Sequence, residues 1–113
     1  MRRALAATAL GLLALASPAL AVTRDDVASE IRAYPWPVNE ALRIAHCESK
    51  LNPSAVGGPN KAGTYDYGVF QLNSGGTYQS LGLTKAQALD YKLNIKAAYR
   101  LYRRRGWRPW TCR

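Results

Sequence analysis

Apolar side chains recur every three or four positions in three stretches of the chain, which is the spacing of one face of an α-helix. The first stretch covers residues 24–34, where Thr23 can cap the start and Pro35 ends the pattern. The last stretch covers residues 91–105 and stops at Gly106, a residue typical of helix C-caps. We therefore expect helices at both ends of the folded region.

The middle stretch carries a carboxyl group on its apolar face. It covers residues 40–50, and we expect Asn39 to cap this helix and Pro53 to stop the chain from continuing it. Glu48 is the i+7 position of the apolar stripe that begins at Ala41. Helical geometry therefore turns the Glu48 side chain toward the core, close to the helix C-terminus.

Glycine, proline and asparagine interrupt the helical spacing over residues 54–68, which favours a small β lobe. Residues 64–67 suit a short strand, residues 68–73 a short helix, and residues 75–76 a loop. Thr84 begins the pattern of a capping box and predicts a further helix after it. The whole pattern predicts a mainly helical α+β domain with one small β lobe.

The first residues have the layout of a secretory signal peptide. A basic start at Arg2 and Arg3 precedes an apolar run over residues 4–16, and small residues follow. The run is short and rich in alanine for a helix that spans a membrane. We expect a signal peptide at residues 1–21 and a folded domain at residues 22–113, so that the protein is secreted or periplasmic; an uncleaved anchor is the alternative.

Cys47 and Cys112 are the only cysteines of the chain, and Cys112 lies 65 residues after Cys47. In an exported protein an even pair predicts a disulfide, whereas two free thiols would suit a reducing compartment. A loop of this order corresponds to roughly 4 kcal/mol of stabilisation through the entropy of the unfolded chain. Such a bridge suits a domain with a small core.

The formal net charge of the chain is +9, and three consecutive arginines occupy positions 103–105. This pattern would suit nucleic acid, or a basic antimicrobial helix. Export argues against a nucleic-acid partner, and an anionic cell envelope is the more natural partner of an exported basic protein. Part of the charge also suits the negative end of a helix dipole.

Glu48 and Asp66 are predicted to lie in contrasting surroundings. Burial on an apolar stripe and the helix C-terminus both raise the pKa of Glu48, which favours a protonated acid. Asp66 follows a polar turn and is expected to stay solvated and ionised. Cleavage of a glycosidic bond uses one carboxylic acid and one carboxylate in this way. The alternatives are a structural Glu48 bonded to a backbone amide and an Asp66 that serves a turn.

Four segments resemble families that share the lysozyme fold, and they occur in the same order as in those families. His46–Val56 resembles the Glu-Ser motif of soluble lytic transglycosylases, and Leu93–Tyr99 their Asn-Ile helix. Asp66–Ser74 is similar to the central motif of c-type lysozymes. Cys47, with the end of the chain at Gly106–Cys112, resembles resuscitation-promoting factors.

The resemblance implies a lysozyme-like fold with a peptidoglycan-cleaving site. It implies that Glu48 is the general acid, that Asp66 is the second catalytic carboxylate, and that Gln71 and Asn73 line the sugar cleft. Ser49, the residue after the acid, is predicted to support the acid's geometry and to belong to the substrate site. A hydroxyl at the surface of the helix end is the alternative for Ser49.

The chain departs from these families at several positions. Residues 90–93, directly before Asn94, lack the proline that transglycosylases usually carry there, and Gly75-Gly76 stand where lysozymes carry an aromatic pair. Sugar stacking must therefore come from elsewhere, and we assign Tyr67 to the substrate site. The other aromatic candidates are Tyr65, Tyr78 and Trp107, and core packing is the alternative for every one of them.

The sequence thus predicts a monomeric, exported enzyme of muramidase type that acts on peptidoglycan glycan strands, without a cofactor. His46 is the only histidine, and without a second ligand at a usual spacing we predict no metal site. The transglycosylase motifs favour a lytic transglycosylase, which forms an anhydro product. The alternatives are a hydrolytic lysozyme that uses Glu48 and Asp66, and a non-catalytic peptidoglycan-binding protein on the same fold.

Overall fold

A computed structural model describes residues 20–112, and the predicted signal peptide lies almost wholly outside this range. The helices are α2 (Arg24–Arg32), α3 (Val38–Ser49), α4 (Gly76–Leu81), α5 (Lys85–Ala88) and α6 (Tyr91–Arg105). The strands are β1 (Val56–Gly57), β2 (Asp66–Tyr67) and β3 (Leu72–Asn73). The predicted α+β class with a small β lobe is confirmed. None of the helices within residues 20–112 has the length and apolar character needed to cross a bilayer.

The starts predicted for α2 and α5 and both ends predicted for α6 are confirmed, whereas α2 ends at Arg32, two residues before the predicted end. Thr23 and Asp26 form a capping box at α2: the Thr23 hydroxyl accepts from the Asp26 amide, and the Asp26 carboxylate accepts from the Thr23 amide. Thr84 caps α5 in the same way. Helix α6 ends at its C-cap Gly106. These ends are set by neighbouring residues, so the local sequence is sufficient to predict them.

The predicted cap at Asn39 is wrong, because α3 begins at Val38, two residues before the predicted start, and Asn39 lies within the helix. Pro37 occupies the N-cap position without a side-chain cap, and its carbonyl oxygen accepts from the Ala41 amide at 2.9 Å. Proline fixes its own φ and lacks an N–H, so it can stand at a helix start without losing a hydrogen bond. Lys50, in the left-handed conformation, ends the helix.

The short helix predicted over residues 68–73 is also wrong, since residues 68–71 form a turn between β2 and β3. Gly68 has φ +80° and Gln71 has φ +50°, and neither value is compatible with a right-handed helix. At the next predicted loop, Gly75 lies in a turn but Gly76 is the first residue of α4.

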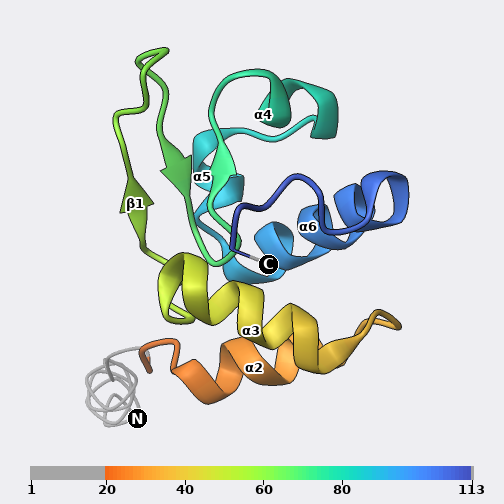
Figure 1. Cartoon of the computed structure of the whole chain (residues 1–113). Helices are drawn as coiled ribbons and strands as arrows, with labels where there is room; N and C mark the ends of the chain where they lie inside the picture. The colour runs from red at the N-terminus through yellow and green to blue at the C-terminus, as the bar shows by residue number, and fades with distance from the viewer. Residues whose placement is uncertain (1–19, 113) are drawn as a thin grey trace, which may run out of the picture.

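The three strands form an antiparallel sheet in the order β1-β2-β3. The register sets Asp66 of the central strand opposite Gly57 on one side and Asn73 on the other. Directly opposed side chains of neighbouring strands lie on the same face of a sheet. The sheet therefore brings Asp66 and Asn73 together. Figure 1 shows α2 and α3 stacked on one side of the molecule, with the sheet and α4 on the other.

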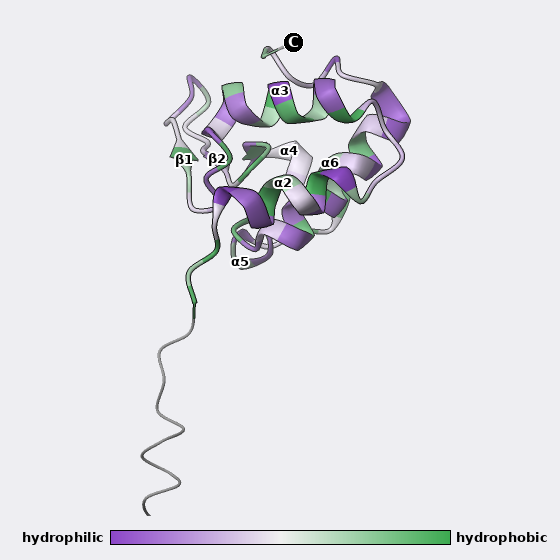
Figure 2. Cartoon of the chain, turned by 90° about the horizontal axis from the view of Figure 1, so that it is seen from below, coloured by the Kyte–Doolittle hydropathy of each residue, from purple (hydrophilic) through white to green (hydrophobic). Residues whose placement is uncertain are grey.

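The core lies between α2, α3 and α6 and extends under the sheet. Hydrophilic and hydrophobic bands follow one another along α3 and α6 (Figure 2), as expected of helices that bury one face. Trp36 lies at the centre, with its ring centroid 5.4 Å from that of Phe70 and 5.6 Å from that of Trp107. Its indole N–H donates to the Ile31 carbonyl oxygen at 2.9 Å, which satisfies the polar atom of a buried ring.

A buried amide holds the turn between β2 and β3. Asn94 of α6 is fully buried, and its Nδ2 donates to the carbonyl oxygens of Tyr67 at 3.0 Å and Ala88 at 2.8 Å. Its Oδ1 accepts from the Phe70 amide at 2.9 Å. A Cβ at Gly68 would overlap both the Ala88 carbonyl oxygen and the Asn94 amide. Glycine at position 68 therefore supplies both the backbone conformation and the space that this contact needs.

We expect Asn94→Ala to lower the free energy of unfolding by about 3 kcal/mol or more, because three buried backbone groups lose their partner. Urea denaturation measures the change. The control is Asn39→Ala, which removes an exposed side chain that caps nothing and should change stability by less than about 0.5 kcal/mol. Equal losses in the two variants would contradict the role assigned to the buried amide.

Candidate active site

A cleft of about 200 Å³ lies where the end of α3, the sheet and the C-terminal segment meet. Glu48 and Asp66 both line it, together with Gln71 and Asn73. The other residues that line it come from β3, α4, α6 and the segment after α6: Leu72, Thr77, Leu101, Pro109, Trp110 and Thr111. The structure thus brings together four of the residues that the sequence predicted for the site.

Glu48 lies next to the last residue of α3 and is partly buried. Burial raises the pKa of its carboxyl group, and the negative charge of Asp66 raises it further. A hydrogen bond with the Cys112 backbone lowers the pKa, but this effect is smaller than that of burial. The net result is an acid that keeps its proton to higher pH than an exposed glutamate does.

Asp66 is held in place by the strand beside it. Asn73 Nδ2 donates to Asp66 Oδ1 at 2.8 Å and to the Thr64 hydroxyl at 2.9 Å. Asn73 Oδ1 in turn accepts from the Gly75 amide at 2.8 Å, which fixes the orientation of the amide group. Asn73 therefore orients the second carboxylate as well as lining the cleft.

Gln71 lines the cleft from the turn that Asn94 holds. Its Nε2 donates to the carbonyl oxygens of Gly68 at 3.0 Å and Ala55 at 3.2 Å, so both amide hydrogens are used within the chain. Gly57 makes room for it, because a Cβ there would lie 2.5 Å from Gln71 Oε1. The amide oxygen is the part of Gln71 that stays available as an acceptor.

Ser49 does not line the cleft. It is 8% exposed, which rules out a surface hydroxyl, and its Oγ lies 2.7 Å from the Val69 carbonyl oxygen and 3.1 Å from that of Ala45. Ser49 therefore connects α3 to the turn between β2 and β3. The structure places it behind the acid, where it fixes the position of the helix end rather than facing the cleft.

The aromatic candidates for sugar stacking lie mostly in the core. Tyr67 is 8% exposed, its ring packs between those of Tyr65 and Tyr78, and it is not among the residues that line the cleft. Trp107 packs on Trp36 and Tyr102. The alternative of core packing therefore describes Tyr67, Tyr78 and Trp107, whereas Tyr65 is exposed.

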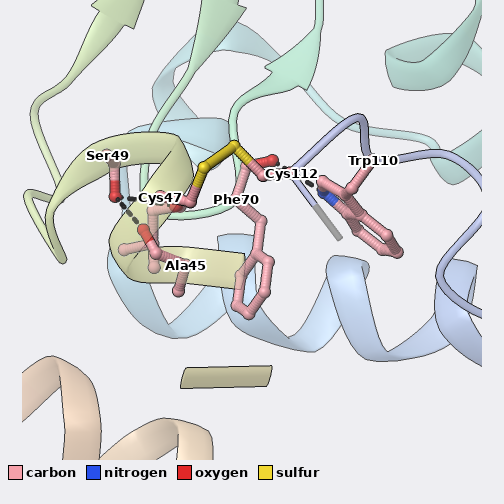
Figure 3. Close-up of a disulfide and its surroundings, with 7 residues drawn as sticks. Ala45, Cys47, Ser49, Phe70, Trp110 and Cys112 are labelled. Atoms are coloured by element: carbon pink, nitrogen blue, oxygen red, sulfur yellow. Dashed lines mark hydrogen bonds between the residues drawn. A yellow bond between two sulfur atoms is a disulfide. The ribbon is translucent and has the colours of Figure 1, made fainter. Parts of the chain in front are cut away.

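The predicted disulfide between Cys47 and Cys112 is confirmed, with 5.9 Å between the two Cα atoms. Figure 3 shows it beside Trp110, whose indole N–H donates to the Phe70 carbonyl oxygen at 2.9 Å. These two contacts hold the C-terminal segment against α3 and the turn. The segment thereby supplies one wall of the cleft, through Pro109, Trp110 and Thr111.

Sequence reasoning missed this wall and also Thr77 and Leu101. A signal for the wall was present: Cys47 is adjacent to Glu48, so a bridge to Cys112 had to bring the end of the chain beside the acid. No comparable local signal marks Thr77 or Leu101, because their place in the cleft depends on how α4 and α6 pack.

Comparison with known proteins agrees with this arrangement. The family described as "Lysozyme like domain" matches residues 26–112. The chain belongs to the lysozyme-like domain family. Lysozyme 2 of Lucilia sericata is 32% identical, over 92% of this chain and 84% of its own length. Lysozyme P of Drosophila melanogaster is 30% identical, over 98% and 89%.

The fold agrees with solved lysozymes as well. The crystal structure of lysozyme from Equus asinus superposes with a TM-score of 0.67 at 24% identity, over 82% of this chain and 85% of that one. Together with the relatives, this confirms the predicted lysozyme-like superfamily and the prediction of a glycosidase-type enzyme. The cleft described above is therefore the candidate active site of a lysozyme-like protein.

We expect Asp66→Asn to lower the pKa of Glu48, because the substitution removes a negative charge that raises it. NMR titration of the Glu48 carboxyl carbon measures the shift. Asp90→Asn is the matched control, since Asp90 caps α6 outside the cleft and asparagine also caps helices. An unchanged Glu48 pKa in Asp66→Asn would show that the two carboxyl groups do not interact.

The double variant Cys47→Ser/Cys112→Ser should lose about 4 kcal/mol of stability, as a closed loop of this length implies. It should also lose activity at temperatures where it remains folded, because the C-terminal wall of the cleft is released. Denaturant titration and an activity assay at low temperature separate the two effects. Full activity in the folded double variant would contradict the role given to the wall.

Proposed function

We propose that the chain is an exported, monomeric muramidase that hydrolyses the β-1,4 bond between N-acetylmuramic acid and N-acetylglucosamine in peptidoglycan. The observation that carries this proposal is the pair of carboxyl groups, Glu48 and Asp66, that line one cleft, with the pKa of Glu48 raised by burial and Asp66 held by Asn73. The disulfide suits the oxidising environment outside the cytoplasm. The basic surface suits retention on an anionic envelope.

In this proposal Glu48 begins the reaction as a protonated acid and transfers its proton to the glycosidic oxygen as the bond breaks. The sugar that remains develops positive charge at its anomeric carbon, and the Asp66 carboxylate stabilises that charge or bonds to the carbon. The Glu48 carboxylate then takes a proton from water, whose oxygen bonds to the anomeric carbon and displaces the Asp66 carboxylate where that had bonded to it. Glu48 regains its proton, and the two sugar products leave.

The relatives favour hydrolysis over transglycosylation, because those reported above carry the name lysozyme. The two segments that resemble transglycosylases contribute Ser49 and Asn94, and both side chains bond to backbone groups inside the fold. These contacts hold the cleft for either outcome, so the two motifs do not distinguish the reactions. Asp66 does, since transglycosylases of this type often do without a second carboxylate. We therefore place hydrolysis first.

A non-catalytic peptidoglycan-binding protein on the same fold is the second candidate. A binder gains nothing from desolvating a carboxyl group, because burial of Glu48 costs stability wherever the group is ionised. Retention of an acid with a raised pKa therefore favours an enzyme.

Glu48→Gln should abolish cleavage of purified peptidoglycan while wild type releases soluble fragments. Mass spectrometry of the wild-type products should show reducing ends; anhydro ends would establish transglycosylation instead. The activity of wild type should fall as pH rises through the folded pKa of Glu48, because the acid loses its proton. Equal cleavage by the variant would show that Glu48 is not the acid.

Folding of the variant is checked by its thermal stability. The pKa of Glu48 is raised in the folded state, so the stability contributed by this group is complete below its unfolded pKa and lost as pH rises through its folded pKa. At pH 8 the variant should therefore unfold at a temperature no lower than that of wild type. A marked decrease would mean that the ionised group makes a stabilising contact.

A further inference from the structure

A second groove, of about 470 Å³, lies beside the candidate active site. It shares Thr77, Leu101 and Pro109 with the cleft that holds Glu48 and Asp66. Gly76 and Ser80 of α4 and Arg104 and Arg105 of α6 complete it. Because the two hollows share three lining residues, they lie side by side, one lined by Glu48 and Asp66 and the other by Arg104 and Arg105.

The lining of this groove does not suit the face of a neutral sugar ring. Among the described residues that line it, none is aromatic and none is acidic. Aromatic rings are the side chains on which protein sites often hold flat apolar surfaces, and no aromatic ring lines this groove. It offers two hydroxyl groups, on Thr77 and Ser80, and two permanent positive charges. Guanidinium groups bind carboxylate and phosphate oxygens through paired hydrogen bonds.

The other arginines of α6 already have partners within the chain. Arg100 Nη1 lies 3.4 Å from the Leu81 carbonyl oxygen, and the Arg103 guanidinium lies 6.0 Å from the centroid of the Tyr99 ring. The Arg105 carbonyl oxygen, at the end of the helix, accepts from Arg108 Nε at 3.1 Å. Arg108 thus satisfies a helix-end carbonyl, and the side chains of Arg104 and Arg105 line the groove instead.

We propose that this groove binds an anionic group, a carboxylate or a phosphate, carried by the polymer whose glycan strand occupies the cleft. This inference rests on the proposed function and narrows its substrate class to glycan with acidic substituents. Peptide stems supply carboxylates, and phosphate-containing wall polymers supply phosphates. A glycan without acidic groups would fill the cleft but leave Arg104 and Arg105 without a partner.

The test measures binding apart from catalysis, in the Glu48→Gln background, by calorimetry. The ligands are a disaccharide fragment with its acidic peptide stem, a glycerol-phosphate oligomer, and neutral N-acetylated chitotetraose. Arg104→Gln/Arg105→Gln should weaken binding of one anionic ligand roughly tenfold, because two partly exposed charged contacts are lost. Chitotetraose should be bound equally well with and without the arginines. Which anionic ligand responds identifies the source of the anion.

Lys92→Gln/Lys96→Gln is the matched control, since it removes the same charge from the same helix and neither residue lines the groove. It should leave the binding of all three ligands unchanged. The proposal is overturned if the arginine variant binds both anionic ligands as well as its parent does, or if the lysine variant loses as much. It is also overturned if chitotetraose binding falls by the same factor.

A failure of the proposed function can be told apart from a failure of the anion site. If the proposed function is wrong, peptidoglycan remains intact after treatment with the wild-type protein. Binding of an anionic ligand through Arg104 and Arg105 would then still hold as a property of the groove. Conversely, a wild type that cleaves peptidoglycan, paired with an arginine variant that binds normally, would leave the enzyme in place and remove the anion site.

Discussion

The buried amide of Asn94 is the contact on which the rest of the site depends. It satisfies the carbonyl oxygens of Tyr67 and Ala88 and the amide of Phe70, and Tyr67 and Phe70 lie more than 20 residues before it. The turn that it holds separates β2 from β3, and these strands carry Asp66 and Asn73. Buried polar groups that are fully bonded favour one arrangement over its competitors. The position of the second carboxylate is therefore set by a residue that never faces the cleft.

Glu48, the proposed acid, is positioned by α3, which lies on the other side of the molecule from the sheet (Figure 1). Glu48 lies near the end of α3, where Ser49 bonds to the turn and Cys47 bonds to the end of the chain. Three anchors of different kinds thus meet around one carboxyl group: a helix, a hydroxyl contact and a covalent bond. Burial of that group costs stability once it is ionised, and the surrounding anchors offset this cost.

Sequence reasoning succeeded where structure is decided locally. The bounds of α6 follow from helical spacing and from Gly106, and the capping box of α2 follows from adjacent residues. It failed at the turn over residues 68–71, because the amide that fixes this turn lies on a later helix. Tyr67 also shows that the motif does not reveal where each side chain points, because it follows Asp66 in the lysozyme-like motif, yet its ring packs in the core. Which side of a strand or helix faces a cleft is settled by packing between distant segments.

The wall of the cleft formed by Pro109, Trp110 and Thr111 has a consequence for when the molecule becomes competent. The bond that secures these residues to α3 forms only where thiols are oxidised. A newly made chain in a reducing cytoplasm therefore lacks a finished site, whatever the state of its helices. Completion of the cleft is thus tied to the redox state of the compartment as well as to folding.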